Sequence, residues 1–303
     1  MKKKAVKYLD KHFVGSIEDK TIIITGGNSG IGLEVARECA YKKMNIILSV
    51  RSLERGEKAK EDILNDFPNA KISVMKLDVS EEESIRGFVN DIISNNIDID
   101  VFYHNAGIFR QPFSLKEGKD IVTSTNYFGP LLLTSLLLPY LKKLNHEVKM
   151  IITGSVAVRW SKLNLDSLYP NPKTSKMVRY SNSKLLDSYL FKYLFDNDKG
   201  NIKYYLVHPG MCYTPLFKKT YKGFFGVIVD IFMRIAANPA WKSALATMLA
   251  ISIDSEEGAF YGPRCLFNAV GYPHKNYFIN KYYKDIDKYI TKSEEIMNCK
   301  LIS

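Results

Sequence analysis

A glycine-rich segment near the N-terminus restricts the fold of this 303-residue chain more than any other feature. The segment, residues 25–32, reads Thr-Gly-Gly-Asn-Ser-Gly-Ile-Gly; it follows three isoleucines and opens an amphipathic stretch. A strand, a tight turn and a helix start are what a nucleotide-phosphate site requires, because glycines admit a sharp turn and a closely approaching pyrophosphate. The helix N-terminus then offers unpaired N–H groups and a partial positive charge. A glycine-rich turn without a ligand is the alternative. The positions predicted to bind are Gly26, Asn28, Ser29, Gly30, Ile31 and Gly32.

Short β-rich runs alternate with segments of helical periodicity through most of the chain. Strands are predicted at residues 21–25, 45–50, 71–77, 99–104, 148–153 and 202–207, and helices at 31–43, 53–66, 81–95, 116–144 and 180–195. Strands that are apolar throughout are buried on both faces, as in a parallel sheet. The alternation also implies right-handed crossovers. We therefore predict an α/β fold with a doubly wound parallel sheet, the Rossmann fold, in a single domain.

The domain itself is predicted to span residues 19–270 and to include an apolar segment at about 215–240. Residues 1–18 are interpreted as a basic N-terminal extension. Residues 271–303 form a C-terminal tail rich in Lys, Tyr and Ile, which is either a packed helix or a mobile end. A hydrophobic content of 46% is enough for a full core, and no linker or repeat divides the chain.

Polar residues and turns follow several of the predicted strands directly. Ligands of doubly wound sheets bind beyond the carboxyl ends of the strands. The residues at such ends are Arg51, Asp78, Asn105, Ser155 and Pro209. Separately, Tyr180 and Lys184 stand four positions apart on a predicted helix, so their side chains share one face. For this pair alone, a solvated helix face is the alternative interpretation.

The order of these motifs resembles that of the short-chain dehydrogenase/reductase family, from about residue 22 to residue 262. The motifs are the glycine-rich turn, Asn105-Ala106-Gly107, Asn126, Ser155, Tyr180-x-x-x-Lys184 and Pro209-Gly210. Three features are similar to the retinol-dehydrogenase-like and WW-domain-oxidoreductase-like branch: the wide gap between Ser155 and Tyr180, the arginine after the second strand, and residues 258–263. The resemblance implies an oxidoreductase that interconverts an alcohol and an aldehyde or ketone.

The resemblance further implies a catalytic tetrad of Asn126, Ser155, Tyr180 and Lys184. A tyrosine hydroxyl can protonate the alkoxide that hydride transfer forms, but its ordinary pKa is about 10. A nearby ammonium favours the phenolate and lowers that pKa, which is the expected role of Lys184 toward Tyr180. In the family the lysine also binds the nicotinamide ribose, the serine hydrogen-bonds the substrate carbonyl, and the asparagine holds a water. Thr153 is an alternative hydroxyl to Ser155.

The end of the second predicted strand indicates which nicotinamide cofactor fits. Sites for NAD(H) usually hold the ribose 2′-hydroxyl with an acidic residue at this place. Residues 49–52 carry no carboxylate, and Arg51 can pair with a 2′-phosphate, so we predict NADP(H), with NADPH favoured over NADH. A surface arginine is the alternative. The resemblance places further cofactor contacts at Asp78, Val79, Asn105, Ala106, Gly107, Tyr180, Lys184, Pro209, Gly210 and Thr214.

The segment after Thr214 is dominated by apolar side chains. As a lid, it would suit a lipophilic aldehyde or ketone. A core helix, a helix that docks on a partner, and a peripheral membrane contact are the alternatives, the last because three lysines precede the apolar run. The predicted function is therefore NADP(H)-dependent oxidoreduction of a small-molecule substrate, with Tyr180 as general acid/base. A non-catalytic NADP(H)-binding regulator is the second hypothesis, and a basic scaffold for anionic lipid or nucleic acid is the third.

Charge, cysteine content and apolar stretches limit which partners, metal sites and cellular compartments we expect for this protein. The net charge of +11 fits a lysine-rich, solvated surface, and attraction to a phosphorylated cofactor, to anionic lipid or to nucleic acid is the alternative. No nucleic-acid motif accompanies the charge, so we expect no nucleic-acid partner. The four cysteines are widely spaced without a metal-ligand pattern, which predicts no metal site and a reducing compartment. The longest apolar stretch, 127–141, is short for a membrane span, which favours a cytoplasmic protein. This stretch and the Tyr180 helix could form the homodimer interface that many relatives use.

Overall fold

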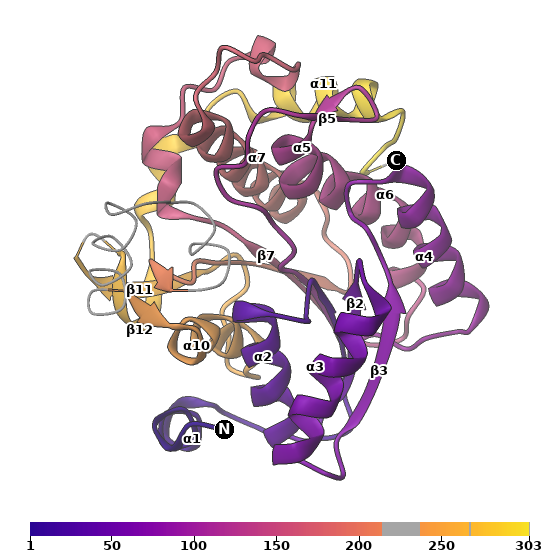
Figure 1. Ribbon diagram of the computed structural model, residues 1–303, viewed down its shortest axis with the longest axis vertical. Helices are drawn as coiled ribbons and strands as arrows, with labels where there is room; N and C mark the ends of the chain where they lie inside the picture. The colour runs from indigo at the N-terminus through magenta and orange to yellow at the C-terminus, as the bar shows by residue number, and fades with distance from the viewer. Residues whose placement is uncertain (214–236, 267, 303) are drawn as a thin grey trace.

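The computed structural model describes residues 1–213, 237–266 and 268–302, which fold around one eight-stranded sheet (Figure 1). The strand order is β12-β11-β8-β7-β4-β1-β2-β3, and all neighbours run parallel except β11 and β12. The strands are β1 (Thr21–Thr25), β2 (Asn45–Val50), β3 (Lys71–Lys76), β4 (Val101–His104), β7 (Val148–Thr153), β8 (Ile202–Val207), β11 (Phe260–Cys265) and β12 (Val270–Asn276). The predicted doubly wound sheet in a single domain is confirmed.

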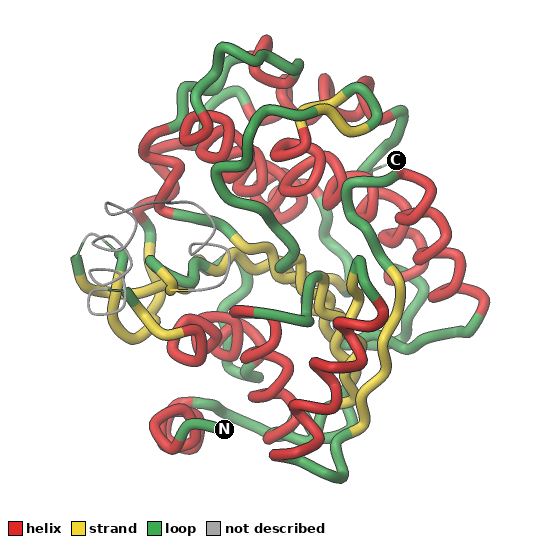
Figure 2. The backbone as a smooth tube through the Cα atoms, in the orientation of Figure 1, coloured by secondary structure: helices red, strands yellow, loops and turns green. Residues whose placement is uncertain are grey.

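Helices cover both faces of this sheet (Figure 2). On one face lie α2 (Gly30–Tyr41), α3 (Leu53–Asp66) and α10 (Ala240–Ile251), with α1 (Lys3–His12) packed against α10. On the other face lie α4 (Glu82–Ser94), α6 (Gly129–Leu141) and α7 (Lys176–Asn197), and α11 (Ile286–Met297) packs on the outside of α7.

Strand β1 shows why the sheet is buried on both sides. Successive side chains of a strand point to opposite faces. Ile23 therefore joins the core beneath α4, α6 and α7, whereas Ile22 and Ile24 join the core beneath α2 and α10. All three isoleucines are fully buried, so this continuous apolar run contributes side chains to two hydrophobic cores, one on each face of the sheet.

The predicted helix at 116–144 begins later than the sequence indicates. Residues 115–120 instead form a short hairpin, β5 (Leu115–Lys116) and β6 (Lys119–Asp120), and the helical stretch starts with α5 (Ile121–Thr123). The buried Asp120 carboxylate fixes this start, because it accepts hydrogen bonds from the backbone N–H groups of Val122 and Thr123. A π-helical turn, η1 (Ser124–Phe128), then leads into α6.

The other predicted elements are present with shifted ends. The six predicted strands agree with the structure to within two residues at each end, and α7 begins at Lys176, four residues before the prediction, with Ser175 as its N-cap. The segment predicted as a tail contributes most of β12 and the whole of α11, and the basic extension contains α1. Most of the predicted lid at 215–240 lies outside the described residues; β10 (Asn238–Pro239) pairs with β9 (Cys212–Tyr213) at its far end.

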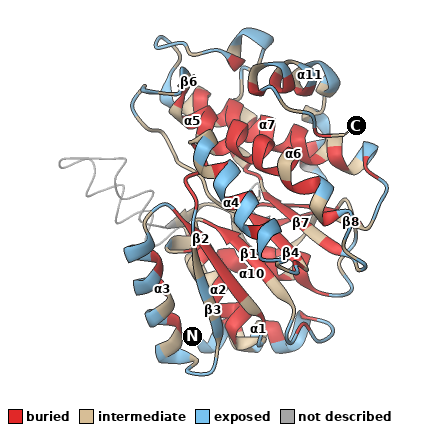
Figure 3. Cartoon of the chain, turned by 90° about the vertical axis from the view of Figure 1, so that its right-hand side faces the viewer, coloured by how far each residue is buried: buried red, intermediate tan, exposed pale blue. Residues whose placement is uncertain are grey.

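One helical stretch among the described residues, Ile121–Leu141, is long and apolar enough to span a membrane by length and composition alone. Within the fold, 83% of its apolar window is buried, as expected for a core helix. Figure 3 shows how much of α6 and α7 is buried, with α11 lying over α7. The chain's own C-terminal helix therefore packs on α7, one of the two elements considered for a dimer interface, and the homodimer itself stays a prediction.

Candidate active site

The glycine-rich turn lies at the carboxyl end of β1, where it leads into α2. Gly26 has a φ of +67°, which only glycine adopts without strain, and a Cβ there would approach the Ala106 Cα to 3.1 Å. A Cβ on Gly32 would stand 2.5 Å from Asn105 Nδ2. Ser29 occupies the N-cap position of α2 but makes no capping hydrogen bond within the described structure. The first N–H groups of α2, from Gly30 and Ile31 onward, are thus available at this edge of the sheet.

Thr25 ties the turn to the next strand, a role the sequence did not reveal. Its Oγ1 accepts hydrogen bonds from the backbone N–H groups of Asn105 and Ala106, both at 2.9 Å. The side-chain amide of Asn105 in turn donates to the carbonyl oxygens of Thr25 (2.8 Å) and Gly26 (3.3 Å). The predicted Asn105-Ala106-Gly107 segment is therefore locked beside the glycine-rich turn.

Asn126 lies in the π-helical turn and holds the loop that follows Gly107. Its Oδ1 accepts from the Ile108 N–H at 2.8 Å, and its Nδ2 donates to the Ile108 carbonyl at 3.0 Å and to Ser183 Oγ at 2.9 Å. π-Helical turns occur often at functional sites because they redirect one side chain out of helical register. Gly107 lies between two of the predicted residues: a Cβ there would be 3.3 Å from Asn126 Oδ1 and 3.8 Å from Lys184 Nζ.

Tyr180 and Lys184 share one face of α7, as predicted. The Lys184 side chain is 7% exposed, and its ammonium donates to the Thr153 carbonyl at 3.0 Å and to Asp187 Oδ2 at 2.7 Å. Burial alone would lower the pKa of Lys184, but the Asp187 carboxylate and Tyr180 outweigh burial and raise it. The Tyr180 ring is partly exposed and meets the Phe109 ring edge-on, with 4.7 Å between centroids. This region therefore holds a buried, charged ammonium on the same helix face as an accessible phenol.

The two candidate hydroxyls differ in their hydrogen bonds. Thr153 Oγ1 donates to the Tyr103 hydroxyl at 3.1 Å, so its proton is engaged. Ser155 lies just beyond β7, at the start of η2 (Val156–Trp160), where its Oγ accepts from the Ala157 N–H at 3.1 Å. The Ser155 hydroxyl proton has no acceptor within the described part of the chain. Of the two, Ser155 is better placed to donate a hydrogen bond to a ligand.

The residues beyond β2 and β3 form a second part of the site. Arg51 follows β2, with its side chain 73% exposed and its Nε 3.9 Å from Asp78 Oδ2. Lys76, which the sequence did not single out, ends β3 and donates to the Arg51 carbonyl at 2.6 Å. The Asp78 carboxylate accepts from the N–H and hydroxyl of Ser80, and Val79 is buried. Because β2 and β7 are separated by β1 and β4, Arg51 and Ser155 mark opposite ends of an extended site.

The loop after β8 borders the Ser155 end. Pro209 and Gly210 follow His208, whose ring is buried and donates a hydrogen bond from Nε2 to the Asn268 carbonyl. Burial lowers the pKa of His208 to about 3, so it is neutral at physiological pH and serves the packing of this loop. Thr214 lies outside the described residues. Among residues 1–213, 237–266 and 268–302, no group of three His, Cys, Asp or Glu side chains could hold a metal ion.

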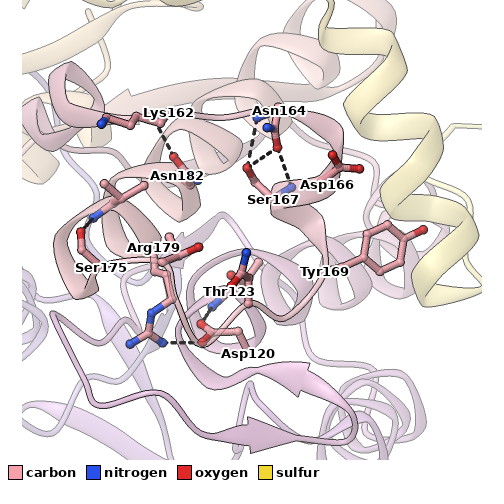
Figure 4. A pocket seen from close by; sticks show the side chains of 13 residues that line it. Asp120, Thr123, Lys162, Asn164, Asp166, Ser167, Tyr169, Ser175, Arg179 and Asn182 are labelled. Carbon is pink, nitrogen blue, oxygen red and sulfur yellow. Dashed lines mark hydrogen bonds and ion pairs between the residues drawn. The ribbon is translucent and has the colours of Figure 1, made fainter.

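A polar cavity of about 470 Å³ lies on the opposite face of α7 (Figure 4). Its wall on α7 includes Arg179 and Asn182, which point away from the Tyr180 face because each residue advances a helix by about 100°. At its base the buried Arg179 guanidinium pairs with Asp120. Asn182 Oδ1 accepts from the Lys162 N–H, so the cavity walls are tied to one another. This cavity is therefore distinct from the candidate active site.

Known proteins resemble this chain along most of its length. The family model described as short chain dehydrogenase matches residues 20–223. The short-chain dehydrogenase TIC 32 B, chloroplastic, of Brassica napus is 33% identical over 65% of this chain, and the match spans 65% of that protein, just under two thirds. Human retinol dehydrogenase 13 is 31% identical over 78% of this chain and 73% of its own length. The crystal structure of an uncharacterized protein from Mycobacterium paratuberculosis has a TM-score of 0.72 and 24% identity, covering 96% of this chain and 97% of that one.

Proposed function

Because this chain belongs to the short-chain dehydrogenase/reductase family, in its retinol-dehydrogenase-like branch, we propose that it interconverts an alcohol and an aldehyde or ketone by hydride transfer. The observation that carries the proposal is the buried Lys184 ammonium, on the Tyr180 face of α7 and 3.0 Å from the Thr153 carbonyl at the end of β7. A charged group at this depth is costly to bury and needs a reason. Activation of a phenol is such a reason, since it requires a fixed positive charge.

The described residues fit a nicotinamide dinucleotide along the carboxyl edge of the sheet. The glycines at positions 26 and 32 leave a cradle that a Cβ would fill, and the uncapped start of α2 suits a pyrophosphate. Asp78 and Val79 would hold the adenine end, and Lys184 the ribose beside the reacting ring. When bound, the cofactor supplies or accepts the hydride.

The proton chemistry belongs to the chain's own residues. In the reductive direction, the hydride adds to the carbonyl carbon and the Tyr180 hydroxyl gives its proton to the carbonyl oxygen, which leaves an alcohol and a phenolate. Lys184 stabilises that phenolate through its positive charge. Ser155 donates a hydrogen bond to the oxygen while negative charge develops on it. The same groups run the oxidation in reverse, with the Tyr180 phenolate as the base.

A preference for NADPH over NADH is supported by the charge at the end of β2. Arg51 and Lys76 are both cationic and lie together, and the N-terminus of α3 begins two residues after Arg51. A 2′-phosphate here would meet positive charge and helix N–H groups. Arg51→Ala should weaken NADPH binding about tenfold or more and leave NADH binding unchanged. Arg55→Ala, which removes an exposed arginine four residues later, in the first turn of α3, is the matched control. Equal loss for both cofactors would contradict the preference.

The substrate is proposed to be lipophilic. The support is the apolar composition of residues 224–233, which follow the Pro209-Gly210 loop. Membrane-surface contact by the same segment is the alternative.

The decisive experiment follows NADPH consumption by the purified protein with carbonyls that range from short ketones through medium-chain aldehydes to retinal and steroid ketones. Turnover should fall by at least about a hundredfold in Tyr180→Phe, because general acid–base catalysis contributes this much. Tyr193→Phe, which removes a phenol hydroxyl from the same helix, should behave as the wild type. Tight NADPH binding with no turnover on any carbonyl would favour the second function, a cofactor-binding regulator.

A further inference from the structure

Asp187 is a buried carboxylate that the proposed chemistry does not use. It lies on α7 three residues after Lys184 and seven after Tyr180, and these spacings place all three side chains on one face of the helix. Its side chain is 3% exposed. Oδ2 accepts from Lys184 Nζ at 2.7 Å, whereas Oδ1 has no hydrogen-bond partner among the described residues. The carboxylate therefore depends on a single partner, the lysine of the candidate active site.

Stability does not explain this arrangement well. Burial of an ion pair costs desolvation energy that the attraction between the charges often fails to recover, and an apolar pair of similar size is frequently as stable. An unpartnered carboxylate oxygen adds to that cost. Burial accordingly raises the pKa of Asp187, although the Lys184 ammonium opposes this effect. A carboxylate that is buried at this energetic cost points to a role in the candidate active site rather than in the stability of the core.

The carboxylate orients the lysine. An ammonium carries three N–H groups. One points to the Thr153 carbonyl and one to Asp187, and together these two acceptors fix the direction of the third. That third N–H is the one left for the Tyr180 side of the site. Without Asp187, the flexible lysine stem would be held by the Thr153 carbonyl alone.

The carboxylate also changes the net charge around Tyr180. With Asp187 ionised, the Asp187, Lys184 and Tyr180 group carries no net charge while the phenol is protonated. Other titratable groups face this group from the neighbouring elements: Tyr103 on β4, Tyr127 in the π-helical turn and His208 after β8. Burial raises the pKa values of Tyr103 and Tyr127 and lowers that of His208, so all three are neutral near neutral pH. Of these described groups around Lys184, Asp187 is therefore the only one that carries a negative charge near neutral pH.

We propose that Asp187 is a positioning residue that orients the Lys184 ammonium and sets the pH at which Tyr180 exchanges its proton. This inference rests on the proposed function of Tyr180 and Lys184. The Asp187 carboxylate would thereby control the pH range of the reaction. Its negative charge disfavours loss of the Tyr180 proton, so this proton stays bound to a higher pH than in a tyrosine–lysine pair without the carboxylate.

The sign of the effect does not depend on which group gives up the proton. In Asp187→Asn the cluster carries one negative charge fewer, so its next proton leaves more easily, whether from Tyr180 or from Lys184. Removal of a nearby charge shifts such an apparent pKa by roughly one to two pH units. The rising limb of the oxidation rate and the falling limb of the reduction rate should both move down by this amount.

The test uses the full chain and two readouts. The first is the pH profile of kcat and of kcat/KM for Asp187→Asn. The second is the near-ultraviolet titration of tyrosinate in the absence of substrate, with the step that is missing from Tyr180→Phe assigned to Tyr180. Both should shift to lower pH. Asp198→Asn is the matched control, since it removes another buried, lysine-paired carboxylate at the far end of α7 and should leave both profiles in place.

The outcomes separate this inference from the proposed function. A Tyr180 titration step that shifts in a protein with no turnover would overturn the function and support the role of Asp187. Unshifted profiles in a folded Asp187→Asn would overturn the role of Asp187 and leave the function intact. Asp187→Ala, which introduces no new polar group, repeats the test if Asp187→Asn does not fold. Failure of both variants to fold would make Asp187 a structural residue and would also overturn the inference.

Discussion

The side-chain amide of Asn105 packs directly against Gly32, so that a Cβ on residue 32 would stand only 2.5 Å from Asn105 Nδ2. The same Cβ would be 2.9 Å from the Gly26 carbonyl oxygen, which is backbone and cannot rotate away. Since Asn105 Nδ2 donates to the Thr25 and Gly26 carbonyls, the close approach joins α2, the glycine-rich turn and the end of β4 in one contact.

Gly32→Ala should therefore destabilise the protein and disturb the turn. Overpacking of this kind costs about 1–3 kcal/mol. The measurement is the free energy of unfolding in urea, together with NADPH affinity, which should fall. Gly87→Ala is the matched control, because a Cβ at this helical position meets nothing within 4 Å, and it should raise stability by up to about 1 kcal/mol. Wild-type stability and affinity in Gly32→Ala would contradict the expectation.

Thr25→Val should loosen the same region without any steric change. The substitution keeps the β-branched shape but removes the oxygen that accepts from the Asn105 and Ala106 N–H groups. Two partly buried donors would lose their partner, at a cost of up to about 1–3 kcal/mol for each group left unsatisfied. Thr25→Ser, which keeps the oxygen, should lie much closer to the wild type. Thermal unfolding of the two variants makes the comparison, and equal melting temperatures would rule out a role for the hydroxyl.

The sheet and the carboxyl edge of its strands could be predicted from the sequence because both depend on local patterns of residues. A run such as residues 22–24 is apolar at every position only if both faces are covered, and the residues that follow such a run must lie at the sheet edge. The contributions of Thr25, Lys76 and Asp187 were invisible for the opposite reason. Each acts through a partner that is distant in sequence or through burial, and neither property produces a recognisable residue spacing in the sequence.

The predicted start of the 116–144 helix was wrong for a related reason. The apolar periodicity of this segment is real, but the Asp120 carboxylate accepts hydrogen bonds from the first N–H groups, so the helix begins at residue 121. The pattern of side chains predicts which residues face the core, whereas a cap decides where the helix starts. The last two strands escaped prediction because Gly262 and Pro263 in β11, and Gly271 and Pro273 in β12, read as turn residues.

Glu38 on α2 makes stability depend on pH. It is fully buried, and neither carboxylate oxygen has a hydrogen-bond partner among the described residues. Burial, with a smaller effect from Glu34, raises the pKa of Glu38 well above its ordinary value. The folded state therefore binds this proton more tightly than the unfolded chain, so stability is lost as pH rises from the unfolded pKa toward the folded one.

Glu38→Gln removes that dependence and should be more stable than the wild type at neutral pH. The difference should shrink as the pH falls toward about 4, where the carboxyl is protonated in both states. Urea unfolding at several pH values makes the measurement, with the exposed Glu61→Gln on α3 as the control. An advantage that grows toward acid pH would have the wrong sign and would refute the argument.

The C-terminal helix should keep the chain from pairing through α7. Ile290 on α11 is fully buried in the same core as α6 and α7, and the Tyr127 hydroxyl donates to Ser293 Oγ at 2.8 Å. Ile290→Asp would place an unpaired carboxylate in that core, at a cost of several kcal/mol, and should release α11. The exposed surface of α7 would then be free to self-associate. Sedimentation should show a monomer for the wild type and for Lys288→Asp, an exposed change on the same helix, but larger species for Ile290→Asp. A wild-type dimer that Ile290→Asp dissociates would mean that α11 belongs to the interface rather than blocking it.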